Sequence, residues 1–116
     1  MKLLIVEDNP LIAAAIEKAG ERLNLQADVA TDGWDAIEKL QNEEYSAIVI
    51  DTEVPRHSGY GVITYLREEV GDHLENVVLM TSSDREEVRL RTSESLCVIG
   101  RTEEIEEIVA AIRSSS

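Results

Sequence analysis

Three polar segments stand directly after apolar runs, and their side chains could perform chemistry together. Glu7 and Asp8 follow the first apolar run, Asp51 follows the third, and Thr81 follows the fourth. Carboxylates bind hard divalent cations, and a carboxylate can also attack phosphorus as a nucleophile. Any one of these residues taken alone is most simply a turn former or helix cap. Their shared position after apolar runs instead favours a common site.

Carboxylates brought to one place must be compensated. Two of them about 4.5 Å apart, at an effective dielectric constant of about 20, repel by roughly 4 kcal/mol. Proton uptake relieves this repulsion, and so does a small cation such as Mg²⁺, which keeps several waters and commonly bridges to phosphate. Asp51 could then form an aspartyl-phosphate while the metal offsets negative charge and Thr81 donates a hydrogen bond.

Five short apolar runs recur along the chain, and four of them are continuous rather than alternating. Continuous runs are typical of strands covered on both faces, as in a parallel sheet, while Asp28 makes the second run suit an edge. Helical patterns fill the gaps, the first after Asn9-Pro10, where Asn can cap a helix and Pro can begin it. This alternation predicts a doubly wound α/β fold with its function at the carboxyl ends of the strands. The predicted strands are Leu3–Val6, Ala27–Ala30, Ala47–Ile50, Val77–Met80 and Leu96–Ile99.

Composition narrows the class of protein. The 116 residues suit one domain, residues 1–116. Asp and Glu total 24 against 11 Lys and Arg, a net charge of −13, which disfavours direct binding to nucleic acid or to an anionic membrane surface. A single cysteine, Cys97, excludes a disulfide within the chain. Because no segment approaches the ~20 apolar residues of a membrane span, we expect a cytoplasmic protein.

In its acidic residues, in Thr81 and in their spacing, the sequence resembles the receiver domain of two-component response regulators. The resemblance rests on Glu7-Asp8-Asn9 after the first run, on Asp51 after Ile48-Val49-Ile50, on Pro55 and Gly59 behind Asp51, and on Thr81. It implies a flavodoxin-like, five-stranded parallel sheet of order 2-1-3-4-5 with helices on both faces.

The resemblance also implies a role for each residue of the site. Asp51 would accept a phosphoryl group from a histidine kinase, a phosphotransfer protein or a small phosphodonor. Asp8, Asp51 and the main-chain carbonyl of Glu53 would ligate Mg²⁺, and Glu7 would act through a bound water. Thr81 would move toward the phosphoryl group, and the last helices and fifth strand would change their contacts with an output protein that the sequence does not identify.

The fifth run departs from the family pattern. The family places Lys and then Pro after this strand, whereas here the residues are Arg101 and Thr102. Arg101 could replace the missing cation, although a planar guanidinium is not equivalent to a compact ammonium. The usual aromatic residue of this strand is also missing, its position being taken by Cys97 or Val98.

Three further expectations concern single elements. The polar segment Arg85–Arg91 predicts a fourth helix that is short, shifted or partly disordered. We expect Trp34 to pack inside the fold, and His57 and His73 to be exposed loop residues. Dimerisation through the last helices has no supporting pattern, so a monomer or weak homodimer is expected.

Two other functions remain open from the sequence. The first is a pseudo-receiver, a protein-interaction module that works without phosphorylation, which the missing Lys favours and the intact acidic residues oppose. The second is a phosphohydrolase of the haloacid dehalogenase type, suggested by Asp51-Thr52-Glu53. The order of the acidic residues and the absence of room for a cap domain speak against this enzyme.

Overall fold

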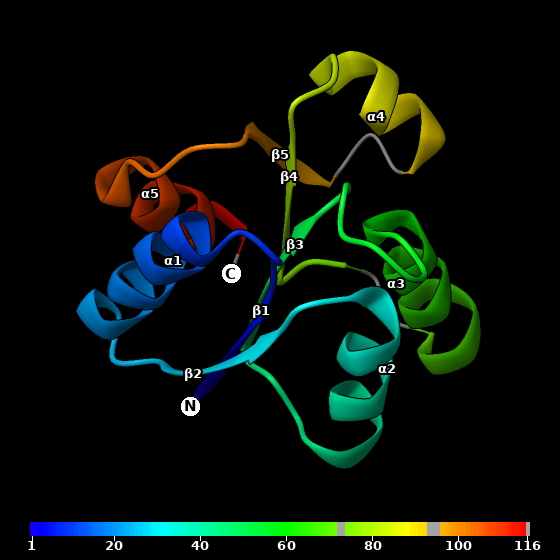
Figure 1. The fold of residues 1–116 in the computed structure, drawn as a ribbon, viewed down its shortest axis with the longest axis horizontal. Helices are drawn as coiled ribbons and strands as arrows, with labels where there is room; N and C mark the ends of the chain where they lie inside the picture. The colour runs from blue at the N-terminus through cyan, green and yellow to red at the C-terminus, as the bar shows by residue number, and fades with distance from the viewer. Residues whose placement is uncertain (72–73, 93–95, 116) are drawn as a thin grey trace.

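Five strands form one parallel sheet, as the alternation of apolar runs and helical patterns predicted. The computed structural model describes residues 1–71, 74–92 and 96–115. Its strands lie in the order β2-β1-β3-β4-β5, which confirms the expected order 2-1-3-4-5 (Figure 1). The strands are β1 (Lys2–Val6), β2 (Gln26–Ala30), β3 (Ala47–Asp51), β4 (Val77–Thr81) and β5 (Cys97–Gly100).

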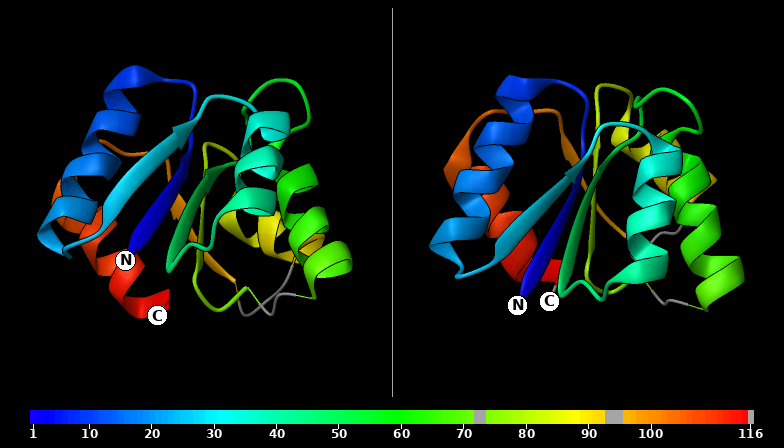
Figure 2. Two further views of the ribbon diagram at one scale, coloured as in Figure 1. Left: turned by 90° about the horizontal axis from the view of Figure 1, so that it is seen from below. Right: turned by 60° about the horizontal axis from the view of Figure 1, so that its bottom comes forward.

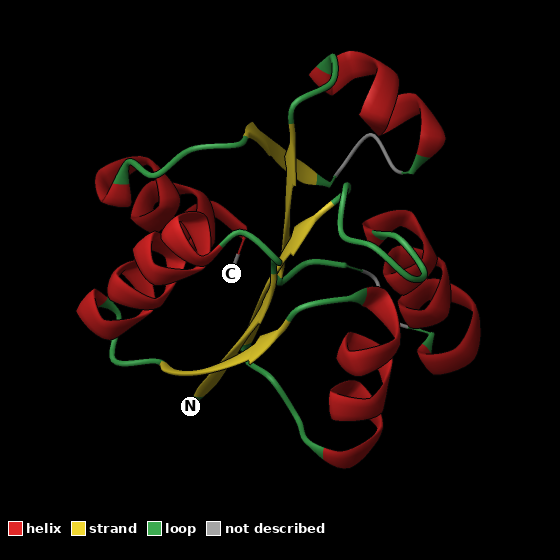
Figure 3. Ribbon diagram, in the orientation of Figure 1, coloured by secondary structure: helices red, strands yellow, loops and turns green. Residues whose placement is uncertain are grey.

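Helices cover both faces of this sheet. Two of them, α1 and α5, pack against each other on one face, and α2, α3 and α4 lie on the other (Figure 1, Figure 2). Loops connect the strands to the helices at both ends of the strands (Figure 3). None of the described helices combines the length and the apolar composition that crossing a membrane requires. The helices are α1 (Pro10–Arg22), α2 (Gly33–Asn42), α3 (Gly59–Tyr65) with its π-helical extension η1 (Leu66–Val70), α4 (Arg85–Arg91) and α5 (Ile105–Ser115).

Side chains along each central strand alternate between two buried hydrophobic clusters. In β1, Leu3 and Ile5 join the cluster beneath α1 and α5, while Leu4 and Val6 join the cluster beneath α2 and α3. Each such side chain contributes about 1.5–3 kcal/mol when it leaves water. Because both faces are covered, neither can be polar, which explains why the apolar runs are continuous.

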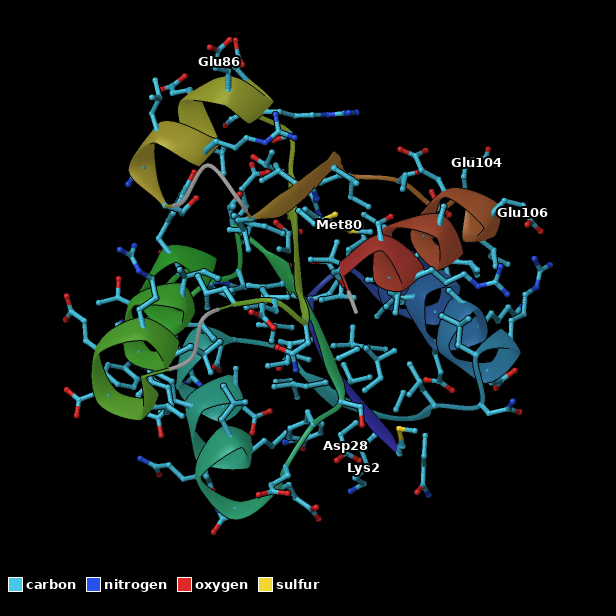
Figure 4. The ribbon with its side chains drawn as sticks, turned by 180° about the vertical axis from the view of Figure 1, so that it is seen from behind. Lys2, Asp28, Met80, Glu86, Glu104 and Glu106 are labelled. Carbon is cyan, nitrogen blue, oxygen red and sulfur yellow. The ribbon has the colours of Figure 1, made fainter. Side chains whose placement is uncertain are left out.

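The strand β2 lies at the edge of the sheet, as Asp28 indicated. The Oδ2 atom of Asp28 accepts hydrogen bonds from the Lys2 ammonium at 3.0 Å and from the Tyr45 hydroxyl at 2.8 Å. Figure 4 shows Lys2 and Asp28 side by side, whereas Glu86, Glu104 and Glu106 project outward from α4 and α5. The edge strand therefore keeps a carboxylate that is locally compensated.

Helix starts follow the local sequence signals. The side chain of Asn9 accepts hydrogen bonds from the backbone N–H of Leu11 at 2.9 Å and of Ile12 at 3.3 Å, and Pro10 is the first helical residue. Asp84 caps α4 in the same way, accepting from the Glu86 N–H at 2.8 Å. These caps satisfy N–H groups that have no partner inside the helix.

The fourth helix is short, as predicted. It has 7 residues, against 13 in α1. Of its side chains, Val88 is buried, while Leu90 is 74% exposed. The segment forms only two helical turns because a single apolar side chain, Val88, is buried against the rest of the fold.

Two large apolar side chains in the helical segments are exposed instead of buried. Trp34 is not packed in the core: it is 58% exposed, with its ring stacked on that of His57. Val70 is 55% exposed although it is apolar, because it lies in the π-helical segment that follows α3. A π-turn contains more residues than an α-turn, so it rotates the following side chains off the buried stripe. The prediction that His57 is exposed is confirmed, and His73 lies outside the described residues.

Candidate functional site

The sheet register brings the polar segments together at one edge. Val6 pairs with Ile50, Asp51 with Met80, and Thr81 with Gly100. The residues that follow these pairs are therefore neighbours across the carboxyl ends of the strands, at the upper edge in Figure 2. This is the convergence that the sequence predicted, and its origin is the parallel direction of all five strands.

Three carboxylates meet at this edge. One oxygen each of Glu7, Asp8 and Asp51 lies within 4.8 Å of the others. Glu7 and Asp51 are each only 1% exposed, whereas Asp8 is open to solvent. Among the described residues, no group donates a well-oriented hydrogen bond to Glu7 Oε2 or to Asp51 Oδ2. Two buried oxygens without donors beside an exposed carboxylate fit the ligand preference of a hard divalent cation.

Arg101 joins the two buried carboxylates. Its Nε lies 2.9 Å from Asp51 Oδ2, and its Nη2 donates to Glu7 Oε1 at 3.2 Å. The backbone holds Arg101 there, because its N–H donates to the Thr81 carbonyl at 3.1 Å and so continues the pairing of β4 with β5. Arg101 thus stands at the position where the family pattern has Lys, and its guanidinium contacts both acids at once.

The charge balance changes the acidity of Glu7. Burial, followed by the neighbouring Asp51 carboxylate, raises the pKa of its carboxyl, Arg101 partly offsets the increase, and the net change is from 4.5 to about 8. Glu7 therefore holds a proton at neutral pH in the metal-free protein. A proton here and a cation between the carboxylates are alternative ways to relieve the same repulsion.

Without metal, the free energy of unfolding is expected to fall as pH rises from about 5 to about 8. In this window folded Glu7 keeps its proton while the unfolded chain, with a pKa near 4.5, has released it. The stabilisation is complete below the unfolded pKa and is lost through the folded pKa, with a slope of at most about 1.4 kcal/mol per pH unit. Urea unfolding in the presence of a chelator measures this slope.

The matched variants are Glu7→Gln and Glu106→Gln, since Glu106 is 80% exposed. The first should flatten the dependence on pH and the second should leave it unchanged. Equal slopes for the wild-type protein and Glu7→Gln would show that Glu7 is ionised throughout.

The loop after β3 presents Asp51 in a fixed orientation. The Glu53 N–H donates to Asp51 Oδ1 at 2.8 Å, and the Thr52 N–H donates to the Met80 carbonyl at 3.0 Å. Gly59 packs against this turn so closely that a Cβ atom there would lie 2.3 Å from the Asp51 carbonyl oxygen. This explains why Gly stands eight residues behind Asp51.

The side chain of Glu53 turns away from the three carboxylates. Its Oε2 accepts hydrogen bonds from the N–H of Ser82 at 3.2 Å and from the Ser82 hydroxyl at 2.5 Å, and these bonds lower the pKa of Glu53. Glu53 therefore links the loop after β3 to the loop after β4. Its side chain is not part of the acidic cluster.

Thr81 ends β4 beside a second hydroxyl. Thr81 Oγ1 accepts from the Ser83 N–H at 3.0 Å, and Thr52 Oγ1 lies 3.2 Å from Thr81 Oγ1. Both threonines are buried, at 1% and 5% exposure for Thr81 and Thr52. Residue spacing did not indicate that Thr52 would be a neighbour of Thr81. The available signal was its place one residue beyond β3, opposite the end of β4.

The same loop is attached to the start of α2. The His57 ring stacks on Trp34 with centroids 4.3 Å apart and planes 14° from parallel, and Arg56 forms an ion pair with Asp32. Arg56 and His57 both have positive φ, at 48° and 75°, a region that costs non-glycine residues energy. Stacking and the ion pair hold these two residues in that conformation, an arrangement that residue spacing did not reveal.

The fifth strand has no aromatic side chain. Val98 is 3% exposed within the cluster beneath α2 and α3, and the Cys97 thiol lies 3.9 Å from the Ala111 carbonyl oxygen. Burial raises the pKa of this thiol, which suits a structural cysteine. The strand thus contributes packing and Arg101 to the site.

Comparisons with known proteins agree with this geometry. Residues 3–113 match the family described as the response regulator receiver domain. The chain is 32% identical over 84 residues to the transcriptional activator protein IrlR of Burkholderia pseudomallei, covering 72% of this chain and 35% of that protein. It is 35% identical over 68 residues to the transcriptional regulatory protein DltR of Streptococcus agalactiae, covering 59% and 30%. The chain therefore spans about a third of the length of these relatives.

Solved structures share the fold. The chemotaxis protein CheY4 of Vibrio cholerae superposes with a TM-score of 0.87 at 16% identity, covering 99% of this chain and 98% of that one. The response regulator TrrA of Thermotoga maritima, solved in complex with Mg²⁺-BeF, superposes with a TM-score of 0.84 at 21% identity and full coverage of both chains. At these identities the likeness establishes the fold alone.

Proposed function

The chain belongs to the response regulator receiver domain family of two-component signalling, and on that premise we propose that Asp51 is its phosphoacceptor. Receiver domains are signalling switches rather than turnover enzymes, so the phosphohydrolase alternative finds no support. The phosphoryl group would come from the phosphohistidine of a kinase or phosphotransfer protein, or from a small phosphodonor. The switch would then alter contacts with an output protein.

One observation carries this proposal: a buried carboxylate at the end of a central strand lies beside two more acids and forms an ion pair with a guanidinium. In the transfer, an Asp51 oxygen forms a bond to phosphorus while the bond from phosphorus to the donor nitrogen or oxygen breaks. The leaving imidazole or carboxylate keeps that electron pair. The product is an acyl phosphate on Asp51.

Receiver domains bind Mg²⁺ at an acidic pocket, and the residues of this site fit that ion. We propose Asp8, Asp51 and the main-chain carbonyl of Glu53 as direct ligands, with Glu7 acting through a water. When bound, the ion would offset negative charge on the transferring group. Asp8 is suited to a direct contact because it is exposed, whereas buried Glu7 already accepts a hydrogen bond from Arg101.

Arg101 and Thr81 would stabilise the product. Arg101 balances the charge of Asp51 before transfer, so its guanidinium is already within reach of the oxygens that phosphorylation brings. Thr81 lies at the next strand end, where its hydroxyl would donate to a phosphoryl oxygen. Both groups act by charge and hydrogen bonding, the main contributions that a protein makes to phosphoryl transfer.

Incubation with Mg²⁺ and acetyl phosphate, followed by the mass of the intact protein, tests the proposal. We expect the addition of one phosphoryl group, lost on treatment with hydroxylamine because acyl phosphates react with it. Omission of the metal should prevent labelling. An unmodified mass, under conditions that label another receiver domain, would instead support the pseudo-receiver, in which Arg101 permanently pairs with Asp51.

A further inference from the structure

An open groove runs between α2 and α3, which lie side by side on one face of the sheet (Figure 1, Figure 2). Its volume is about 400 Å³. From α2 it is lined by Trp34, Ile37 and Gln41, whose spacing places them on one stripe of the helix. Tyr65 lines it from α3. A groove between two helices is a shape that can receive a third helix.

The end of this groove beside the loop after β3 is aromatic. The Trp34 side chain is 58% exposed, and its ring is held by stacking on the His57 ring. Gly61 leaves room for that ring, because a Cβ atom there would lie 2.4 Å from His57 Nε2. Trp34 therefore presents a large apolar surface in a fixed orientation, which lowers the entropy lost when a partner packs on it.

The other end of the groove is acidic. Glu68 and Glu69 line it from η1. Within the part of the chain that the structure describes, neither carboxylate forms an ion pair or a hydrogen bond through its side chain. The basic residues of these helices are engaged elsewhere, since Lys39 forms an ion pair within α2 and Arg67 donates to the Thr92 carbonyl. Negative charge at this end is therefore uncompensated.

We propose that the groove is a docking site for an amphipathic helix of a partner protein, which packs an apolar side chain on Trp34 and places Lys or Arg beside Glu68 and Glu69. The two ends of the groove differ in chemistry, so complementarity requires the same difference in the partner. Trp34 and Gln41 are seven residues apart on α2, or roughly 10 Å, the separation of positions i and i+7 on the partner helix. This docking goes beyond phosphoryl transfer and does not require it.

A synthetic peptide tests this docking on the unphosphorylated protein. The probe is an alanine-based peptide of about 18 residues, long enough to form a helix, with two leucines one turn apart and two arginines two turns further on. Trp34 fluorescence and amide chemical shifts follow its binding. We expect saturable binding with the shifts gathered on α2 and α3, and no saturation by a peptide with glutamates in place of the arginines. Shifts gathered on other helices would overturn the proposal.

Two variants of the groove locate the binding. Trp34→Ala removes the aromatic anchor and should weaken binding roughly five- to thirtyfold, the range of a central interface residue. Thr64 is an exposed residue of the groove, so Thr64→Arg should weaken binding comparably by adding bulk and a cation, while Trp34 stays in place as the reporter. Chemical shifts replace fluorescence for Trp34→Ala, and urea unfolding confirms that both variants fold.

The net charge of −13 attracts any cationic peptide, so the acidic end needs its own control. Neutralising Glu68 and Glu69 together by Gln should weaken binding about two- to fivefold, the effect of exposed ion pairs. Neutralising the exposed residues Glu86 and Glu87 of α4 removes the same charge away from the groove and should have a smaller effect. Equal losses in the two double variants, or wild-type affinity in Trp34→Ala, would show non-specific attraction and overturn the proposal. Failure to label the protein with phosphate would leave these results unchanged.

Discussion

An Asp51→Asn variant is expected to lose phosphorylation down to the background of the measurement. The amide has the shape of the carboxylate but no anionic oxygen to attack phosphorus. Asp51 is 1% exposed, and its Oδ1 accepts from the Glu53 N–H, a bond that the amide oxygen can keep. The variant should therefore fold while losing the reaction. The mass of the intact protein after incubation with acetyl phosphate and Mg²⁺ reports the result.

The same substitution should change two other properties. It removes one of two buried acids, so without metal the free energy of unfolding should rise by about 1–3 kcal/mol at pH 8, where more of Glu7 is ionised than at neutral pH and repels Asp51. Magnesium affinity should fall, because one proposed ligand has lost its charge. Titration calorimetry and urea unfolding measure these changes.

Asp28→Asn is the matched control for this variant. Asp28 is also a strand aspartate, but it is paired with Lys2 on the edge of the sheet and is absent from the acidic cluster. The control should be labelled like the wild-type protein and bind Mg²⁺ with the same affinity. Labelled Asp51→Asn, or unchanged metal affinity in this variant, would show that the acceptor or the metal site lies elsewhere.

The second large effect is expected at Arg101. An Arg101→Met variant keeps an apolar stem but leaves two buried carboxylates without their cation. The side chains of Glu7 and Asp51 are 0% and 1% exposed and that of Arg101 is 28% exposed, so solvent weakens this interaction only in part. Without metal, the free energy of unfolding should fall by about 1–3 kcal/mol at pH 8. The loss should be smaller at pH 6, where Glu7 is protonated.

Metal binding and phosphorylation should respond to Arg101→Met in opposite directions. Magnesium should bind more tightly, because the guanidinium no longer competes for the carboxylates, and should restore much of the lost stability. The rate of phosphorylation should fall, since a cation near the transferred group is missing. Arg101→Lys should restore only part of the rate, because one ammonium does not reproduce the contacts of a planar guanidinium with two acids.

Arg22→Met provides the control for Arg101→Met. Arg22 forms an ion pair with Glu106 in which the two side chains are 51% and 80% exposed, so its removal should cost no more than about 0.5 kcal/mol. If Arg101→Met were as stable as this control at pH 8 and bound Mg²⁺ with unchanged affinity, Arg101 would not be compensating the buried acids.

No side chain of β5 is aromatic, so an aromatic ring of this strand is not available to move together with Thr81. Val98 is buried, and its side chain has no polar group that could form a hydrogen bond to Thr81. The loop after Asp51 is instead attached to α2 through the Trp34–His57 stack and the Asp32–Arg56 ion pair. Because Trp34 is the only tryptophan of the chain, its fluorescence is a direct reporter of this loop.

The sequence alone predicted the fold and the place where the acidic residues meet. Short continuous apolar runs that alternate with helical patterns are typical of strands covered on both faces, and parallel strands bring their carboxyl ends to one side of the sheet. Glu7, Asp8, Asp51 and Thr81 follow directly from that rule, because each stands at the end of such a run. The short fourth helix was predictable for a related reason, since a segment with few apolar residues buries little surface.

Tertiary structure decided which side chains touch. The contact of Arg101 with both Glu7 and Asp51, and that of Thr52 with Thr81, depend on the register of strands far apart in the chain. The exposure of Trp34 depends on His57 from another loop. Periodicity describes one element at a time, whereas these contacts arise between elements. Their geometry is set by how the whole sheet pairs, and local sequence does not contain it.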